Sequence, residues 1–329
     1  MAGVMRFVPL DPYVLALMAT VGGASLFPAQ GAWAEGAAVA VTGAIFLLFF
    51  LYGARLAPRE VGRGMAHWRL QLLVLLCTYG VFPLLGLGIA ALGLGLAPPL
   101  VLGFLYLCVL PSTVQSSIAF TGIAGGNVPA ALTAATVSNL LGVVATPVLV
   151  GLLMGGPGGG FSLDALEDIA LQVLLPFALG QLARPVLAGW VARHRRVTSM
   201  VDRGAILLVV YVAFSEGMTS GVWSLMSGWD FLLVMALDCV VLALVMAASL
   251  GLGSWAGFSR ADRLTLFFCG SKKSMATGLP MAGVLFAGQA VPLIVLPLML
   301  FHQIQLLVCA ALAQHWARTR PLADDANPR

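Results

Sequence analysis

The chain consists mainly of long apolar stretches that are separated by short polar segments. A helix that crosses a lipid bilayer needs about 20 apolar residues, and stretches of this length recur from one end of the sequence to the other. We therefore predict a series of transmembrane helices. The stretches lie near residues 9–29, 37–57, 68–94, 98–124, 128–155, 165–190, 203–226, 229–257, 262–287 and 291–317.

Composition agrees with lipid as the main solvent of the protein. Hydrophobic residues make up 60% of the 329 residues and charged residues only 9%, whereas about a quarter of an average soluble domain is charged. The sequence therefore predicts an all-α membrane protein. It has no HExxH, GxSxG or phosphate-loop motif and no cysteine pair with zinc spacing, so neither an enzyme nor a cofactor is expected.

The basic residues indicate the orientation of the chain in the membrane. The formal net charge is +4, but the arginines all fall in loops on one predicted side, which argues against a nucleic-acid partner. The opposite loops, around Glu35, Ala97, Asp164, Ser227 and Gly288, have no Lys or Arg. Cytoplasmic loops retain positive charge, so we expect an inner-membrane protein with both termini in the cytoplasm.

An alternative interpretation makes the first apolar stretch a cleaved signal peptide, because Ala32, Trp33 and Ala34 form an AxA-like site. Cleavage would leave nine spans. We prefer ten, because Arg6 is the only basic residue before the stretch and because Pro9 and Asp11 precede it.

A glycine-rich segment at residues 154–161 lies near the middle of the chain, with five predicted spans on each side. If the halves are homologous, an odd number of spans inverts the second half relative to the first, as in many secondary transporters. We therefore predict two inverted five-helix repeats, residues 1–156 and residues 157–329.

Two of the predicted spans are interrupted where hydrocarbon is expected. The expected helix breaks are Pro111 in the fourth span, and Gly270 and Pro280 in the ninth. Unwound backbone inside a membrane must face protein or water, so paired breaks indicate a binding site near the midplane. Ordinary kinks, with hydroxyls bonded back to the helix, are the alternative. The candidate binding residues at the breaks are Ser112, Thr113, Gln115, Ser116, Ser117, Asn127, Ser271, Lys272, Lys273 and Ser274.

Four ionisable residues lie in apolar context: Lys272, Lys273, Glu216 and Asp238. A charge in the centre of a membrane helix costs at least about 2.5–3.5 kcal/mol and normally faces a cavity or a partner. We expect one lysine to bind a ligand and the other a carboxylate. Glu216 is either a cavity carboxylate or half of a structural ion pair, and Asp238 is expected to be structural.

The tenth predicted span also carries polar residues in an apolar helix. His302 lies one turn before Gln305, so the pair can support the break in the ninth span, and His302 is included among the candidate binding residues. No set of metal ligands is evident.

Several long motifs resemble the SBF-like branch of the bile acid:sodium symporter superfamily, whose members include sodium-dependent transporters. They are the run PSTVQSSIAFTGIAGGNVPAALTAATVSNLLGVVATP from Pro111 to Pro147, the run FSRADRLTLFFCGSKKSMATGLPMAGVLF from Phe258 to Phe286, and the segments WVARHRRV, VDRGAILLVVYVAFSEG and LPLMLFHQIQLLVCA. Together they cover nearly the whole chain.

The resemblance implies ten helices in two inverted repeats, with broken helices 4 and 9 that cross at the midplane. It also implies a core domain of helices 3–5 and 8–10 that moves against a panel domain of helices 1, 2, 6 and 7. The positions that align with the usual sodium ligands are Phe268, Lys272, Ala131 and Ala135, none of which binds sodium through its side chain. Thr133, Thr136, Ser138 and Asn139 are nearby polar substitutes. A fixed lysine ammonium is expected to take the electrostatic place of one ion.

These observations favour a secondary transporter that moves a small organic anion across the cytoplasmic membrane by alternating access. Its coupling ion is sodium or a proton, or transport is facilitated exchange without a coupling ion. Its other partner is membrane lipid, and its oligomeric state stays open, a monomer included. The alternative is a regulatory or scaffold membrane protein that has this fold but does not transport.

Overall fold

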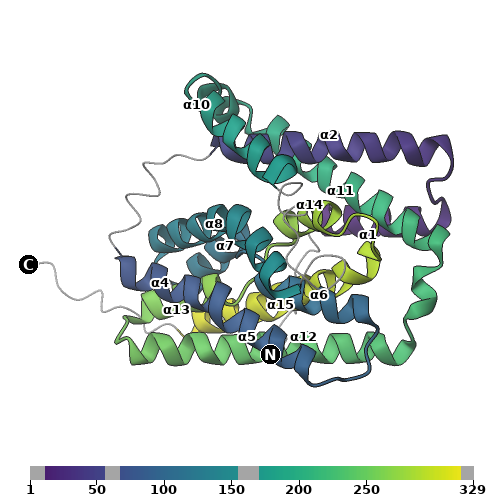
Figure 1. Cartoon of the computed structure of the whole chain (residues 1–329). Helices are drawn as coiled ribbons and strands as arrows, with labels where there is room; N and C mark the ends of the chain where they lie inside the picture. The colour runs from purple at the N-terminus through teal and green to yellow at the C-terminus, as the bar shows by residue number, and fades with distance from the viewer. Residues whose placement is uncertain (1–11, 56–66, 155–169, 320–329) are drawn as a thin grey trace, which may run out of the picture. The chain divides into compact units, whose positions relative to one another are not determined.

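A computed structural model describes residues 12–55, 67–154 and 170–319 (Figure 1). The predicted glycine-rich linker after Met154 and both ends of the chain, with the arginines at these ends, lie outside these residues. The described residues are helical, with short connections. Two compact units can be distinguished, and each combines segments from both halves of the sequence.

The first unit contains four long helices: α1 (Pro12–Leu26), α2 (Ala32–Arg55), α10 (Leu175–Arg193, from Pro176 onward) and α11 (Arg195–Ser220). Glycines allow α2 and α10 to pack closely. A Cβ atom at Gly53 would lie 2.0 Å from the carbonyl oxygen of Phe177, and one at Gly180 would lie 2.0 Å from that of Phe50. Any larger residue at either glycine would force the two backbones apart.

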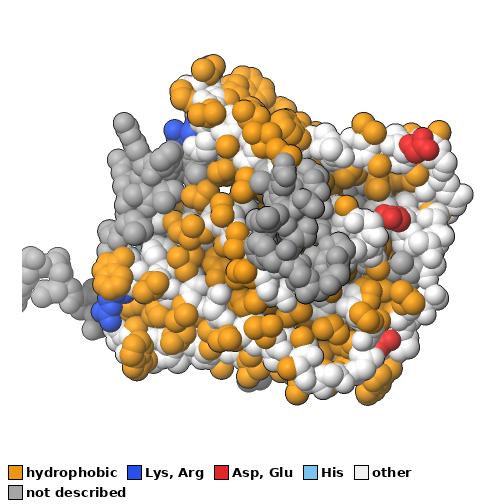
Figure 2. All heavy atoms as spheres, in the orientation of Figure 1, with side chains coloured by type: hydrophobic (Ala, Val, Ile, Leu, Met, Phe, Trp, Pro, Cys, Tyr) orange, Lys and Arg blue, Asp and Glu red, His pale blue; other side chains and the backbone are white. Residues whose placement is uncertain are grey.

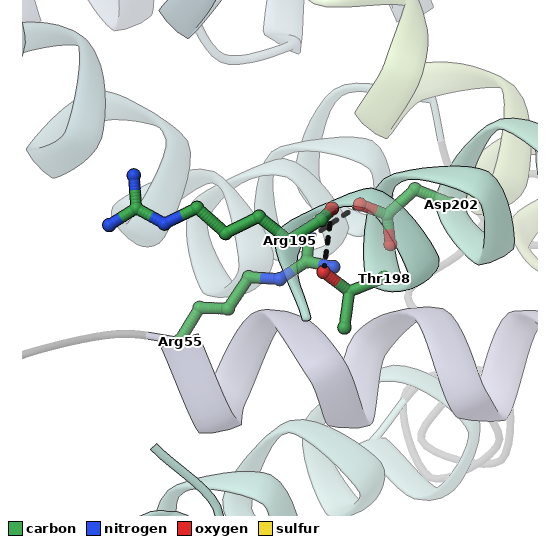
Figure 3. Close-up of polar contacts among 4 residues, drawn as sticks. All are labelled: Arg55, Arg195, Thr198 and Asp202. Carbon is green, nitrogen blue, oxygen red and sulfur yellow. Dashed lines mark hydrogen bonds and ion pairs between the residues drawn. The ribbon is translucent and has the colours of Figure 1, made fainter. Parts of the chain in front are cut away.

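An ion pair joins α2 to α11 within this unit (Figure 3). Nη1 of Arg55 lies 2.5 Å from Oδ2 of Asp202. One turn before Asp202, the Thr198 hydroxyl donates to the carbonyl oxygen of Arg195 at 3.2 Å. This is the only ion pair within the described ranges.

The second unit contains the remaining helices. They are α4 (Trp68–Leu76), the π-helical turn η2 (Cys77–Val81), α5 (Phe82–Ala91), α6 (Pro98–Val109), α7 (Val114–Ala124), α8 (Val128–Met154), η3 (Ala170–Leu174), α12 (Gly228–Trp255), α13 (Arg260–Gly270), α14 (Met275–Leu285) and α15 (Val291–Arg318). A short 3₁₀ turn, η4 (Val222–Leu225), lies where the chain passes from the first unit to the second.

The core of the second unit forms where α4, α8 and α13 meet. Small residues on α8, such as Ala131 and Ala134, pack there against Leu70 and Leu266. Helix α15 runs beside α6 (Figure 1). Gly103 permits this approach, because a Cβ atom there would lie 2.4 Å from the carbonyl oxygen of Ile294.

Six of the described helices are long and apolar enough to cross a membrane, and the bent pair of α6 and α7 would be a seventh span. Many large apolar side chains are exposed, among them Leu182, Val186 and Trp255. Among the side chains coloured by type in Figure 2, most are hydrophobic and few are charged. This surface suits lipid. The arrangement of ten spans in inverted repeats stays a prediction.

Candidate functional site

Two helices of the second unit are interrupted, each by a segment of four residues. Helix α6 ends at Val109 and α7 begins at Val114, with a bend of 59° between them. Helix α13 ends at Gly270 and α14 begins at Met275. We call residues 110–113 the first break and residues 271–274 the second break. The first break contains the predicted helix breaker Pro111, and the second begins directly after the predicted breaker Gly270.

The two breaks contact each other through hydrogen bonds. The backbone N–H of Ser274 donates to the carbonyl oxygen of Pro111 at 2.8 Å. The Thr113 hydroxyl donates to the carbonyl oxygen of Lys273 at 2.9 Å. Segments that are 160 residues apart in sequence therefore meet at one crossing.

Two serine hydroxyls, in and just after the first break, bind carbonyls that the second break leaves without helical partners. Ser112 donates to the carbonyl oxygen of Cys269 at 2.6 Å, and Ser117 donates to that of Phe268 at 3.0 Å. Both serines are fully buried. Because a buried carbonyl without a donor costs free energy, these hydroxyls stabilise the unwound end of α13.

Gln305, on α15, binds the backbone of the second break, and His302, on the same helix, contacts Gln305. The Gln305 amide accepts from the N–H of Lys273 and donates to its carbonyl oxygen, both at 2.9 Å. Nε2 of Gln305 also lies 2.8 Å from Nδ1 of His302. The side chain of Gln305 therefore replaces the helical hydrogen bonds that Lys273 lacks.

Both lysines of the second break are fully buried, but their surroundings differ. Nζ of Lys273 donates to the carbonyl oxygens of Thr78, Cys108 and Leu110 at 2.8, 2.8 and 2.6 Å. This differs from the expected carboxylate partner. Nζ of Lys272 has no hydrogen-bond partner within the described residues and lies 4.0 Å from the ring centroid of Phe120, in cation–π geometry.

The acidic residues do not pair with these lysines in the described part of the chain. Asp238 is fully buried on α12, and neither of its carboxyl oxygens has a hydrogen-bond partner there. Glu216 lies on α11 in the other unit, and its side chain is exposed. Its expected role in binding stays a prediction.

The remaining candidates at the breaks form two groups: serines that bond to a helix end, and two residues at the start of α7. Ser271 donates to the carbonyl oxygen of Phe267 at 2.6 Å, and Ser274 accepts from the N–H of Thr277 as the N-cap of α14. Gln115 is exposed at the start of α7. The buried hydroxyl oxygen of Ser116 has no partner in the described structure.

Two predicted residues lie away from the breaks. Pro280 was expected to interrupt the ninth span but lies inside α14, which continues through it. The unwinding occurs before α14 begins, so this proline removes a single helical donor. Asn127 lies at the start of α8, where it accepts from the N–H of Ala130 and donates to Asp262 at 2.9 Å. It therefore joins α8 to the beginning of α13.

Several positively charged groups meet at the crossing. Both α7 and α14 begin there, and the first N–H groups of a helix carry partial positive charge. The Thr113 hydroxyl is engaged by Lys273, so α7 has no side-chain cap. Two lysines add to this charge, and no acidic side chain of the described residues pairs with either of them. Such a region attracts anions.

Tyr79 and Thr277, which help to build the crossing, were not among the predicted site residues, and Ser138 and Asn139 were named only as polar substitutes for sodium ligands. Tyr79 donates to the carbonyl oxygen of Ser138 at 2.7 Å, and the Ser138 hydroxyl accepts from the N–H of Ser112 at 3.1 Å. Thr277 donates to Asn139 at 2.8 Å. The polar residues Thr78 and Tyr79 in an otherwise apolar span were the available signal.

The described residues form a helical protein of membrane-spanning character, in which two broken helices cross inside one unit. Comparison with known families places it more narrowly. The model of the SBF-like CPA transporter family matches residues 11–318, and the chain belongs to this family. It is thus a multi-pass membrane protein of a transporter family, as the sequence motifs suggested.

Individual relatives agree with this assignment. The chain is 52% identical over 323 residues to an uncharacterized protein, PA2026, of Pseudomonas aeruginosa, with 98% of this chain and 96% of the relative covered. It is 46% identical over 310 residues to the Escherichia coli protein named "Putative symporter YfeH", covering 94% and 93%. Sodium/bile acid cotransporter 7 of Mus musculus is 25% identical over 307 residues, covering 91% and 90%.

Proposed function

We propose that the protein is a secondary active transporter that moves a small organic anion across the cytoplasmic membrane by alternating access. The observation that carries this proposal is positive charge at the crossing that no carboxylate of the described residues pairs with. Two helix N-termini and two ammonium groups meet there without an acidic partner among the described residues. Membership of a transporter family and the names of two relatives, a symporter and a cotransporter, support transport itself.

The N-terminus of α7 is the proposed contact for the anion. Its first-turn N–H groups, from Val114 to Ser116, have no helical acceptors. Thr113 and Ser116 are half-buried and Gln115 is exposed, so this end of the helix is the more open part of the crossing. A carboxylate or similar group bound there would accept hydrogen bonds from the backbone and from the Gln115 amide.

Lys272 is the proposed lysine for the anion. All three donors of the Lys273 ammonium are engaged by carbonyls, whereas those of Lys272 have no acceptor in the described structure. Lys272 is fully buried in this conformation. We propose that the anion reaches it in another state of the transport cycle.

Uptake into proteoliposomes tests the proposal. A panel of labelled organic anions is offered to wild type, to Lys272→Ala and to empty liposomes, with an imposed sodium gradient or pH gradient. We expect saturable uptake of at least one anion by wild type, driven by one of these gradients and reduced by at least about tenfold in Lys272→Ala, since loss of one charge-assisted bond costs about 1.5–3 kcal/mol.

The outcomes separate the parts of the proposal. Uptake that is equal in wild type and Lys272→Ala would contradict the role of this lysine. Absence of uptake for every anion under both gradients would contradict transport and favour a regulatory or scaffold protein. A preference for organic cations would contradict the sign of the substrate.

A further inference from the structure

Three backbone carbonyl oxygens point at one buried cation of the chain itself. The carbonyl oxygens of Thr78, Cys108 and Leu110 lie 2.6–2.8 Å from Nζ of Lys273. The ring centroid of Phe82 lies 4.0 Å from the same atom. A lysine side chain has three N–H donors only in its ammonium form, so three short carbonyl contacts identify a charged occupant.

The carbonyl of Thr78 is available because of a local defect in the helix formed by α4, η2 and α5. In η2 the hydrogen bonds run to the fifth residue, and the N–H of Phe82 binds the carbonyl oxygen of Cys77. The corresponding donor for Thr78 would be residue 83, which is a proline without an N–H group. The Thr78 carbonyl therefore has no partner in its own helix.

The other two carbonyls are available because α6 ends at the first break. The helical partner of Cys108 would be the N–H of Ser112, which donates instead to the Ser138 hydroxyl at 3.1 Å. Leu110 has an extended conformation (φ −73°, ψ 155°), so its carbonyl leaves the helical direction. Both are buried, and neither is bound by another donor in the described structure.

The neighbouring carbonyls have other donors, which shows that the convergence on Lys273 is selective. The Val109 carbonyl oxygen accepts from the Thr146 hydroxyl at 2.8 Å, and that of Pro111 accepts from the N–H of Ser274 at 2.8 Å. Only the carbonyls of Cys108 and Leu110 in this part of the chain turn to the ammonium. We call these two, together with that of Thr78, the carbonyl cage.

We propose that the carbonyl cage is a monovalent-cation site whose resident occupant is the Lys273 ammonium. Carbonyl oxygens that replace a hydration shell are the ligands with which proteins bind monovalent cations. The cage has no carboxylate among its contacts, so it needs one positive charge and no more. Lys273 supplies that charge from within the chain, so no free ion is required at this place.

The distances in the cage indicate which free cations can replace the lysine. Oxygen atoms that lie 2.6–2.8 Å from a nitrogen suit a cation of the size of ammonium. Methylammonium and potassium therefore fit better than sodium, and choline, which has no N–H donor and is much larger, does not fit. One consequence rests on the proposed transport function: the coupling ion of the transporter binds elsewhere.

Thermal unfolding of the purified protein tests the cage without reference to transport. Wild type, Lys273→Ala and Lys272→Ala are melted in choline, sodium, potassium or methylammonium chloride at one ionic strength. Lys272→Ala is the matched control, because it removes the adjacent buried ammonium, which has no hydrogen-bond partner in the described structure. A titration of each cation against choline shows whether any effect saturates.

We expect the melting temperature of Lys273→Ala to be lowered in choline and to rise saturably with methylammonium and potassium, and less with sodium. Wild type and Lys272→Ala should melt at the same temperature in all four salts as they do in choline. If Lys273→Ala does not fold in choline, it is purified in methylammonium, where folded protein should be recovered.

Three results would overturn the proposal. The first is that Lys273→Ala melts at one temperature in all four salts, and the second is that it folds in none of them. The third is that a cation raises the melting temperature of wild type as much as that of the variant. A failure of uptake in the transport experiment has no bearing on these outcomes, so the two proposals fail separately.

Discussion

Replacement of Gln305 by leucine should destabilise the crossing. This side chain makes two hydrogen bonds to the backbone of Lys273, each of 2.9 Å, and it is fully buried. Leucine has a similar volume and fills the space without replacing either bond. The N–H of Lys273 then has no acceptor, while its carbonyl oxygen keeps the hydroxyl of Thr113.

The size of the effect follows from these two losses. A buried donor left without a partner costs about 1–3 kcal/mol, and loss of one of two donors to a carbonyl costs about 0.5–1.5 kcal/mol. We expect a loss of about 2–4 kcal/mol. At about 2 °C for each kcal/mol, the melting temperature should fall by about 4–8 °C.

The assay is thermal unfolding in detergent, with Gln303→Leu as the matched control. Gln303 lies on the same helix, and no hydrogen bond of its side chain is found in the described structure. Its replacement should leave the melting temperature within about 1 °C, as for substitutions that remove no specific contact. Equal shifts in the two variants would contradict this prediction, because Gln305 would then hold the second break no better than an unpaired amide.

Two further predictions concern packing and the hydroxyls of the first break. Gly103→Ala should sharply reduce folded protein in detergent extracts, because its Cβ atom would meet backbone at 2.4 Å, whereas Gly22→Ala, with nothing within 4 Å, should fold normally. Comparable yields would contradict the close packing of α6 on α15. Ser112→Ala should lower stability by about 1–3 kcal/mol, because the Cys269 carbonyl loses its 2.6 Å donor. Ser116→Ala, which removes an unpartnered hydroxyl, should melt like wild type, and a larger loss in Ser116→Ala would refute this assignment.

The positions of the two breaks could be predicted from sequence because their causes are local. Pro111 cannot donate a helical hydrogen bond, and Gly270 weakens a helix that continues into polar residues. Hydrocarbon cannot satisfy the backbone groups that are freed there, so the neighbouring hydroxyls and lysines marked the site. The prediction of a break at Pro280 was wrong, because one proline inside a packed helix removes only one donor.

The partners of these groups could not be predicted, because they come from segments far apart in sequence. Nothing local indicates that Ser112 bonds to Cys269, 157 residues away. The carbonyl cage requires a π-helical turn ahead of Pro83, and such turns have no reliable sequence signal. Asn127 was included among the candidate binding residues, but its position directly before a helix that begins with Val128 favours an asparagine cap.

The place where the transported anion binds decides whether the crossing of the two breaks is the binding site. An experimental density map of the protein in lipid nanodiscs, with the anion identified by uptake, measures this place. We expect density for the anion at the crossing, against the first turn of α7, with both breaks unwound and Nζ of Lys273 in the carbonyl cage. Density remote from both breaks, or α6–α7 and α13–α14 as two continuous helices, would contradict this expectation.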